Sequence, residues 1–433
     1  MAQSEWAPRA KTSRSKRTAR HFSLPYHLQR LRLHRTGESI SPPVLLEKGV
    51  RIGIVCYPTI GGSGVIATEL AHHLACRGIT VHLISSEAPV RYTRCLPNLY
   101  FHQVMPPDYP VFRYRPYESA LAGRLVRLAE DGLDIIHVHY AIPHAISAYL
   151  AHQALLHQGK NIAVITTLHG TDTTLVSQDP DLYPIVELAL RHSDEVTAVS
   201  SALARETQAK FRLEKPPQVI PNFVDTELFS PQRRDPALRK AFAREEEILL
   251  VHASNFRPIK QTPQILHIFS ELLQIGIPAK LLMIGDGPER AQCEHLAHAL
   301  GIWHKVHFVG SAHEIVSLLA IGDVFLLSSA YESFGLAALE AMACGVPVVA
   351  PAVGGLPEVV SPESGRLYPA NDLTAAVHAL LAVIEALPDF KAGARTRAQR
   401  FDASKVIPLY EQLYERTLHQ KAPLREEKAP WHN

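Results

Sequence analysis

The feature that most constrains the fold is an alternation of short apolar runs with helix-like segments, which begins near residue 50 and occurs twice. Short runs rich in β-branched residues predict buried strands. In the first half the predicted strands cover residues 51–57, 80–85, 134–140, 162–168, 195–200 and 218–220, and the predicted helices cover 65–77, 144–157, 182–192 and 201–211. Strands that alternate with helices form parallel sheets, so the first half is predicted to be one doubly wound domain.

The alternation restarts after the stretch NFVDTELFSPQRRDP, which is rich in proline and charge. Here the predicted strands cover 248–253, 280–284, 306–309, 324–327 and 347–350, and the predicted helices cover 263–273, 289–300, 314–320 and 336–343. We therefore predict an α/β fold with two Rossmann-like, doubly wound parallel-sheet domains, 49–224 and 225–400, that face a ligand-binding cleft. Residues 401–433 are predicted to be a C-terminal helix and tail, and the helix, 404–418, could pack on either domain.

The charge is unevenly distributed along the chain. Residues 1–50 contain ten Lys and Arg against three Asp and Glu, which leaves 34 against 39 in the rest. Residues 1–48 are predicted to be a basic, flexible extension: a solvated tail, an arm for an anionic partner, or a targeting or wrongly assigned start segment. The mildly acidic body gives no support to nucleic-acid binding.

Two further observations bear on the compartment. The longest charge-free stretch of the body, 341–357, contains three prolines and three glycines, so we expect no membrane insertion. The five cysteines have no C-x-x-C spacing, which indicates reduced thiols in a cytoplasmic protein.

The stretch CYPTIGGSGVIATEL, residues 56–70, joins the first predicted strand to a helix through three glycines. Gly62, Gly64 and Ala67 fit G-x-G-x-x-A, a variant of the dinucleotide fingerprint, with Glu87 at the next strand end as the ribose ligand. An NAD-dependent dehydrogenase is therefore one interpretation. A lone match of this kind is weak, and it leaves the motifs of the second half unexplained.

The sharpest of those motifs is YESFGLAALEAMACG, residues 331–345. Glu332 is predicted to close a strand, and Glu340 lies eight residues on, inside a helix that begins near Phe334. The N–H groups of Phe334, Gly335 and Leu336 could bind a phosphate oxygen, and the two carboxylates could accept hydrogen bonds from sugar hydroxyls. In the alternative, Glu332 is a helix cap and Glu340 a solvated side chain. An unpaired carboxylate in so apolar a segment would be costly, which favours a sugar-nucleotide site.

A second motif, HASNFRPIK, places Arg257 and Lys260 on a loop after a predicted strand, where two cations could neutralise a departing diphosphate. A third, HVHYAIPH, places His137 and His139 on one strand face, as two metal ligands would lie. No further ligand follows at a recognisable spacing, so we expect buried, hydrogen-bonded histidines and no bound metal.

Together these motifs, in this order, resemble family 4 of the glycosyltransferases over about residues 50–418. The resemblance implies the two-domain GT-B fold and sugar transfer with retention, usually without a metal. It assigns the donor sugar to Glu332, the ribose to Glu340, and the diphosphate to Arg257 and Lys260. The donor site that it implies is completed by the glycine loop and the helix start: Gly61, Gly62, Ser333, Phe334, Gly335 and Leu336.

The first half narrows the substrates. Its segments HVHYAIPH, TTLHGTD and PNFVD are similar to the branch of the family that moves N-acetylglucosamine from UDP-GlcNAc to L-malate in bacillithiol biosynthesis. By this resemblance UDP-GlcNAc is a substrate, no cofactor is needed, and His169 acts with Arg257, Lys260 and Glu332 in catalysis. Thr167 and His169 are expected in a strand-end loop, and the predicted acceptor site contains Ser63, Arg91, Tyr140, Thr167 and His169.

Several alternatives stay open at this point. A family 4 transferase could use inositol phosphate, a lipid or a sugar phosphate as acceptor, and a non-catalytic sensor would bind the donor without turnover. The sequence is also compatible with a homo-oligomer. Because no carboxylate stands out as a nucleophile, we predict same-face transfer, in which a UDP phosphate oxygen takes the proton of malate's hydroxyl.

Overall fold

The computed structural model describes residues 46, 49–59, 61–108, 115–174, 178–312 and 314–421. The predicted extension, 1–48, lies outside the described residues except for Leu46, and the tail beyond residue 421 also lies outside them. Leu46 is buried in the core of the first sheet, so packing begins before the predicted boundary at residue 49.

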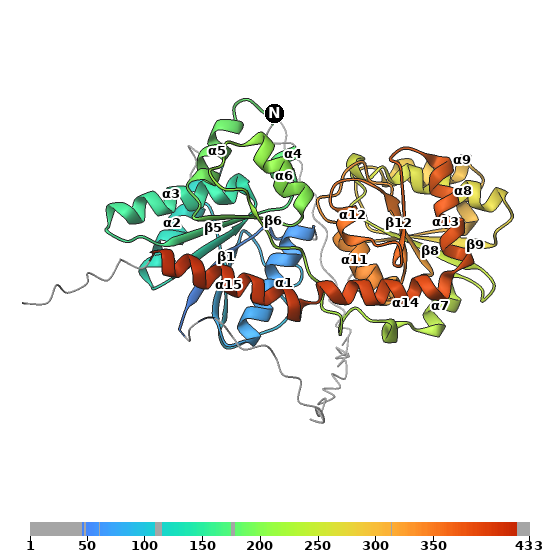
Figure 1. Cartoon of the computed structure of the whole chain (residues 1–433), viewed down its shortest axis with the longest axis horizontal. Helices are drawn as coiled ribbons and strands as arrows, with labels where there is room; N and C mark the ends of the chain where they lie inside the picture. Colours follow the sequence, from blue (N-terminus) through green and yellow to red (C-terminus); the bar gives the residue numbers. More distant parts are fainter. Residues whose placement is uncertain are drawn as a thin grey trace, which may run out of the picture. The chain divides into compact units, whose positions relative to one another are not determined.

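In the described chain, the first sheet has seven strands in the order β3-β2-β1-β4-β5-β6-β7, all parallel (Figure 1). Ile52 of β1 pairs with Val81 of β2 on one side and with Ile135 of β4 on the other. The strands are β1 (Arg51–Val55), β2 (Thr80–Ser85), β3 (Leu99–Gln103), β4 (Ile135–His139), β5 (Ala163–Leu168), β6 (Glu195–Ala198) and β7 (Gln218–Val219). The helices among them are α1 (Gly62–Cys76), α2 (Tyr117–Glu130), α3 (Ile146–His157), α4 (Thr171–Thr174), α5 (Tyr183–Arg191) and α6 (Ser201–Lys210).

The second sheet, again counting only described residues, has six parallel strands in the order β10-β9-β8-β11-β12-β13. Its strands are β8 (Ile248–Ala253), β9 (Ala279–Ile284), β10 (Val306–Gly310), β11 (Val324–Leu326), β12 (Val348–Pro351) and β13 (Gly365–Tyr368). The helices of this half are α7 (Pro236–Phe242), α8 (Thr262–Gln274), α9 (Arg290–Ala299), α10 (Ile315–Ala320), α11 (Leu336–Ala343), α12 (Leu356–Val359), α13 (Leu373–Glu385) and α14 (Leu387–Ala398).

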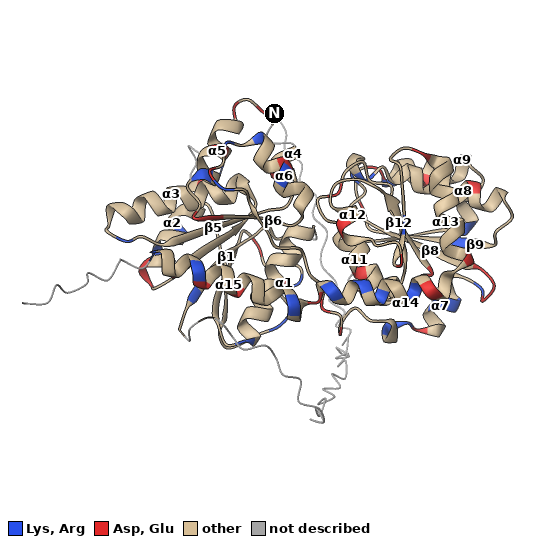
Figure 2. Ribbon diagram, viewed as in Figure 1, with Lys and Arg blue, Asp and Glu red and all other residues tan. Residues whose placement is uncertain are grey.

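Both faces of the first sheet are buried under helices. Ile52 and Ile54 pack with residues of α1 and of the last helix, α15 (Ala403–Lys421), whereas Val55 and Ile136 pack with α2 and α3. Charged side chains gather on helices and loops and are sparse on the strands (Figure 2). Helix-covered parallel sheets in both halves confirm the predicted fold class.

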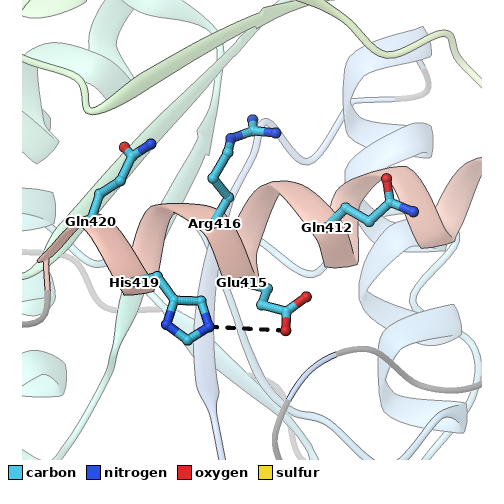
Figure 3. Close-up of a pocket in the computed structure, with 5 residues that line it drawn as sticks. All are labelled: Gln412, Glu415, Arg416, His419 and Gln420. Carbon is cyan, nitrogen blue, oxygen red and sulfur yellow. Dashed lines mark ion pairs between the residues drawn. The ribbon is translucent and has the colours of Figure 1, made fainter.

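The sequence left open which half the last helix packs on. In the structure α15 packs on the first half, against α1 and β5. Its inner face buries Tyr410 and Tyr414 completely, and its Glu411 forms an ion pair with Arg77 of the segment that ends α1. Its outer face is polar (Figure 3) and carries Gln412, Glu415, Arg416, His419 and Gln420.

Eight of the strands and helices named above have no counterpart among the predicted ones: β3, α2, α4, α7, α12, β13, α13 and α14. The two strands lie at sheet edges, where burial is one-sided and partial, so neither shows the continuous apolar run of a central strand. Among the described residues, no single helix is long and apolar enough to cross a bilayer; only the sharply bent pair 373–385 and 387–401 meets the length and composition criteria together.

Candidate functional site

The glycine run after β1 brings two backbone segments into contact. A Cβ on Gly64 would lie 2.6 Å from the carbonyl oxygen of Tyr57, so a larger residue would not fit. Gly61 is the N-cap of α1, so Gly62 and Ser63 lie in the first helical turn and not, as expected, in a turn before the helix. The N–H groups of a first turn have no partner inside the helix and can bind an anion.

Tyr140 follows β4 with a φ of 92°, which residues with a side chain rarely adopt. Strain of this kind costs of order 1–3 kcal/mol and persists only where the surroundings fix it. The Tyr140 phenol donates to Thr171 Oγ1 (3.0 Å), and its ring stacks on His169 with centroids 5.7 Å apart. The structure therefore brings together two residues of the predicted acceptor site.

Asp172, in α4, is hydrogen-bonded to both the segment after β4 and the loop of His169. Its carboxylate accepts hydrogen bonds from the backbone N–H groups of Ala141 (2.7 Å) and His169 (3.0 Å). The side chain is fully buried, and this burial raises the pKa of Asp172 to about 6, against the lowering effect of the hydrogen bonds. The sequence interpretation missed Asp172, although an Asp three residues after a loop histidine, in HGTD, is a recognisable backbone-capping signal.

The histidines of HVHYAIPH are buried and hydrogen-bonded, as predicted. His137 Nδ1 bonds the Tyr414 hydroxyl (2.7 Å), and His139 Nδ1 shares a proton with His169 Nε2 (2.9 Å). Burial lowers the pKa of His137 and His169 to about 3, so both rings are neutral. No group of three or more His, Cys, Asp or Glu suited to a metal occurs in the described residues.

Thr167 lies inside β5, in agreement with the predicted strand 162–168, and not in the loop after it, to which the acceptor site had assigned it. Its side chain is fully buried, and its hydroxyl bonds His137 Nε2 (2.7 Å) and Thr197 Oγ1 (2.6 Å). A hydroxyl engaged in the sheet core gives no support to a role in acceptor binding.

On the donor side, Glu332 does not close a strand as predicted. β11 ends at Leu326, because the hydroxyl of Ser328 turns to the carbonyls of Lys260 and Gln261 and the chain leaves the sheet. In the loop that follows, Glu332 Oε1 accepts from Lys260 Nζ (2.6 Å) and from Ser329 Oγ (2.8 Å). Glu332 and Lys260 are thus brought together, and Ser329 is a partner that the sequence interpretation missed.

Arg257 lies on the loop after β8, three residues before Lys260, and its side chain is exposed. Burial raises the pKa of Tyr140, and the charge of Arg257 opposes that rise, so the cation lies within electrostatic range of the phenol. The predicted diphosphate ligand of the second half therefore lies within electrostatic range of one residue of the predicted acceptor site of the first.

The helix of the YESFGLAALE motif has the predicted bounds, 336–343, and begins two residues after Phe334, near which its start was also expected. Its N-cap is Gly335, in the left-handed conformation with a φ of 95°, so α11 starts at Leu336 and Phe334 is a buried loop residue. Among the residues that the structure describes, no side chain makes a capping hydrogen bond at the start of this helix, which contradicts the alternative of Glu332 as its cap. Glu340 is 5% exposed, which contradicts the alternative of a solvated side chain.

Arg91 lies in the segment between β2 and β3, where its guanidinium forms an ion pair with Glu340 (Nη2 to Oε1, 2.6 Å). A longer contact, 3.7 Å, joins it to Glu69 of α1. Arg91 was expected at the acceptor site, yet the structure places it on the predicted ribose ligand.

The loops of the two halves touch at the predicted site. A Cβ on Gly170, whose φ is 113°, would lie 2.7 Å from Ser333 Cβ, so the HGTD loop packs directly on the donor loop. Gly62 lies beside Leu336, since a Cβ there would be 3.7 Å from Leu336 Cδ2. The start of α1, the His169 loop and the start of α11 therefore converge.

A second contact between the halves lies at the start of α6. Glu358, in α12, accepts hydrogen bonds from the N–H groups of Ser201 (2.8 Å) and Ala202 (2.7 Å), and a carboxylate at a helix N-terminus is favourable. Beside it, Ser200 Oγ donates to the carbonyl of Ser333 (2.6 Å). These bonds fix the donor loop against the first half.

Comparison with known proteins matches two family models. The model for Glycosyltransferase Family 4 covers residues 60–228, and the model for Glycosyl transferases group 1 covers residues 234–397. The chain is 41% identical over 375 residues to the N-acetyl-alpha-D-glucosaminyl L-malate synthase of Bacillus anthracis, which is 84% of this chain and 96% of that protein. It is 28% identical over 391 residues to a D-inositol 3-phosphate glycosyltransferase of Geodermatophilus obscurus, covering 80% of this chain and 83% of that one.

Solved structures agree on the fold. Sucrose-phosphate synthase from Thermosynechococcus elongatus superposes with a TM-score of 0.71 at 22% identity over 86% of this chain and all of that one. Anabaena HepE, solved with UDP and glucose, gives 0.69 at 20% identity over 86% and 99%. The dehydrogenase interpretation of the glycine run is therefore wrong, and the chain belongs to family 4 of the glycosyltransferases, hexosyltransferases with the GT-B fold.

Proposed function

We propose that this glycosyltransferase moves N-acetylglucosamine from UDP-GlcNAc to the hydroxyl of L-malate with retention of configuration. The observation that carries the choice of substrates is the 41% identity, over nearly the whole length of the relative, to a protein named for that product. The geometry supports the choice, because the acceptor side offers anion-binding groups and the donor side offers two carboxylates beside cations, one buried and one partly buried.

Malate is a dianion with one hydroxyl, so its pocket needs N–H donors or cations. The first turn of α1 supplies N–H groups near Ser63, and Arg257 lies within electrostatic range of Tyr140. On the donor side, Glu332 and Glu340 would accept from the sugar and ribose hydroxyls, and Arg257 and Lys260 would neutralise the diphosphate.

In the proposed reaction malate's hydroxyl oxygen forms a bond to the anomeric carbon while the bond from that carbon to the UDP oxygen breaks. The hydroxyl proton passes to the departing phosphate oxygen on the same face. Lys260 and Arg257 stabilise the charge that develops on UDP, and neutral His169 offers a ring N–H to a sugar hydroxyl. The proposal needs neither a metal ion nor a cofactor.

The test is UDP release from UDP-GlcNAc with a panel of L-malate, D-malate, inositol phosphate and sugar phosphates, and mass spectrometry of the product. We expect UDP release with L-malate and a product of the mass of GlcNAc-malate. Because relatives at 28% identity are named for D-inositol 3-phosphate, turnover with inositol phosphate and none with malate would overturn the acceptor but keep the family. UDP binding without release for any acceptor would favour the sensor.

A further inference from the structure

A partly buried arginine joins the two halves at the donor site. The guanidinium of Arg91 lies 2.6 Å from Glu340 Oε1, and its Cζ lies 5.3 Å from the centroid of the Phe229 ring. Arg91 also reaches Glu69 of α1 at 3.7 Å. The arginine therefore contacts a helix of each half and the chain that connects them.

We infer that Arg91 is a positioning residue for the carboxylate that binds the donor's ribose, and not a ligand of the acceptor. The inference rests on the proposed function, since it takes the donor to be a uridine diphosphate sugar whose ribose meets Glu340. According to this inference Arg91 contributes to the affinity for the donor, and other residues determine the affinity for malate.

The first argument is the cost of burying Glu340. The side chain of Glu340 is 6% exposed, and among the described residues Arg91 is the cation that forms an ion pair with it. Removing one partner of a buried pair leaves an uncompensated charge, which is costly at so buried a position. Arg91 therefore compensates the charge of the carboxylate that would accept hydrogen bonds from the ribose.

The second argument is the geometry of the pair. Arg91 engages Oε1, and within the described residues no hydrogen bond is made to Oε2. A ribose hydroxyl can therefore bind Oε2 while the ion pair stays intact. The pair also fixes the orientation of the carboxylate, since the guanidinium is held on its other side by Glu69 and by the Phe229 ring.

The third argument concerns the two halves. Arg91 and Glu69 belong to the half that carries the predicted acceptor loops, and Glu340 belongs to α11 of the other. The ion pair forms only where the halves are in contact, so the donor carboxylate is completed by a side chain of the acceptor half. Donor affinity should then depend on Arg91 even when no acceptor is present.

The experiment measures UDP binding by calorimetry, without acceptor, for the full chain and its variants. Arg91→Gln should raise the Kd for UDP by about tenfold, since a hydrogen bond to a charged group is lost. Arg94→Gln is the matched control, because Arg94 lies three residues on with an exposed side chain, and it should leave the Kd unchanged. Circular dichroism of each variant establishes that it is folded.

A double-mutant cycle shows whether Arg91 acts through Glu340. If it does, Arg91→Gln combined with Glu340→Gln should bind UDP no more weakly than Glu340→Gln alone. Additive losses would overturn the inference, and so would an Arg91→Gln variant that binds UDP as tightly as the wild type or more tightly.

Steady-state kinetics separates donor from acceptor. Arg91→Gln should raise the KM for UDP-GlcNAc about tenfold and leave the KM for malate within about twofold of the wild type. A rise confined to the malate KM would restore Arg91 to the acceptor site and overturn the inference. Failure of the wild type to bind UDP would instead refute the proposed donor, so the two failures are distinguishable.

Discussion

Asp172→Asn should impair turnover while leaving the stability of the fold nearly unchanged at pH 7.5. The carboxylate accepts two backbone hydrogen bonds, from Ala141 and His169, and an amide of the same shape can accept only one of them well. The unpaired N–H loosens the strained backbone after Tyr140 or the loop of His169. Both rings belong to the proposed site, so we expect kcat/KM to fall roughly tenfold to hundredfold, or about 1.4–2.7 kcal/mol.

The Asp172→Asn substitution has two opposing effects of similar size on the free energy of unfolding. Leaving a buried N–H unpaired costs about 1–3 kcal/mol. The substitution also removes a buried charge, and raising the Asp172 pKa from 3.8 to about 6 corresponds to about 3 kcal/mol of penalty for the ionised form. We therefore expect the free energy of unfolding at pH 7.5 to change by less than about 2 kcal/mol in either direction.

The pH dependence provides a check with a defined sign. Because the pKa is higher in the folded state, that state binds the proton more tightly, and this group's contribution to stability falls as pH rises from 3.8 through about 6. Between pH 7.5 and pH 5 the wild type should gain about 1.4 kcal/mol relative to the variant. Burial holds the pKa of neighbouring His169 near 3 and raises that of Tyr140, so neither ring titrates in this window.

The assay combines denaturant unfolding at pH 5 and pH 7.5 with UDP-release rates. Asp179→Asn is the matched control, since Asp179 is exposed and accepts a backbone N–H from Asp181, and it should change neither quantity. A variant Asp172→Asn with wild-type kcat/KM would refute the positioning role. A loss of stability above about 3 kcal/mol at pH 7.5 would show that removing the buried charge does not offset the cost of the unpaired N–H group, and would refute this reasoning.

Other predictions follow from the donor and acceptor sides. Lys260→Ala should lower kcat at saturating UDP-GlcNAc roughly hundredfold, because a preorganised group that stabilises developing charge is lost, and unchanged turnover would refute its role. Ser63→Ala should raise the KM for malate more than that for UDP-GlcNAc, measured by initial rates with each substrate varied in turn. Excess EDTA should leave the rate of UDP release unchanged, and a loss restored by a divalent cation would contradict transfer without a metal.

Residues close together in sequence were predictable, because local spacing reflects local structure. Arg257 and Lys260 lie on the loop after β8 as expected, and the eight-residue spacing of Glu332 and Glu340 does span a loop and a helix. The bounds of that helix, 336–343, are confirmed, and the error concerns the preceding strand, which Glu332 does not close. Ser328 turns the chain out of the sheet through tertiary contacts that no periodicity shows.

Partners that lie far apart in sequence were not predictable. Arg91 and Glu340 are separated by 249 residues, and Thr167 is bonded to a histidine 30 residues away. Arg91 was predicted to bind the malate dianion on the basis of its charge alone, because a single sequence does not show which residues of its two halves are in contact. Thr167 was grouped with the loop of His169, although the predicted strand 162–168 already contained it.

The site residues that the sequence showed are held by contacts that it did not show. Lys260 and Ser329 share Glu332 Oε1, Arg91 is paired with Glu340, and Asp172 binds the backbone of His169. Buried carboxylates lower stability unless they are fully bonded, yet they provide fixed acceptors that need no reorganisation during reaction. Neutral replacements at these three carboxylates should therefore cost activity more than stability, which is the reverse of the pattern expected for residues that serve packing alone.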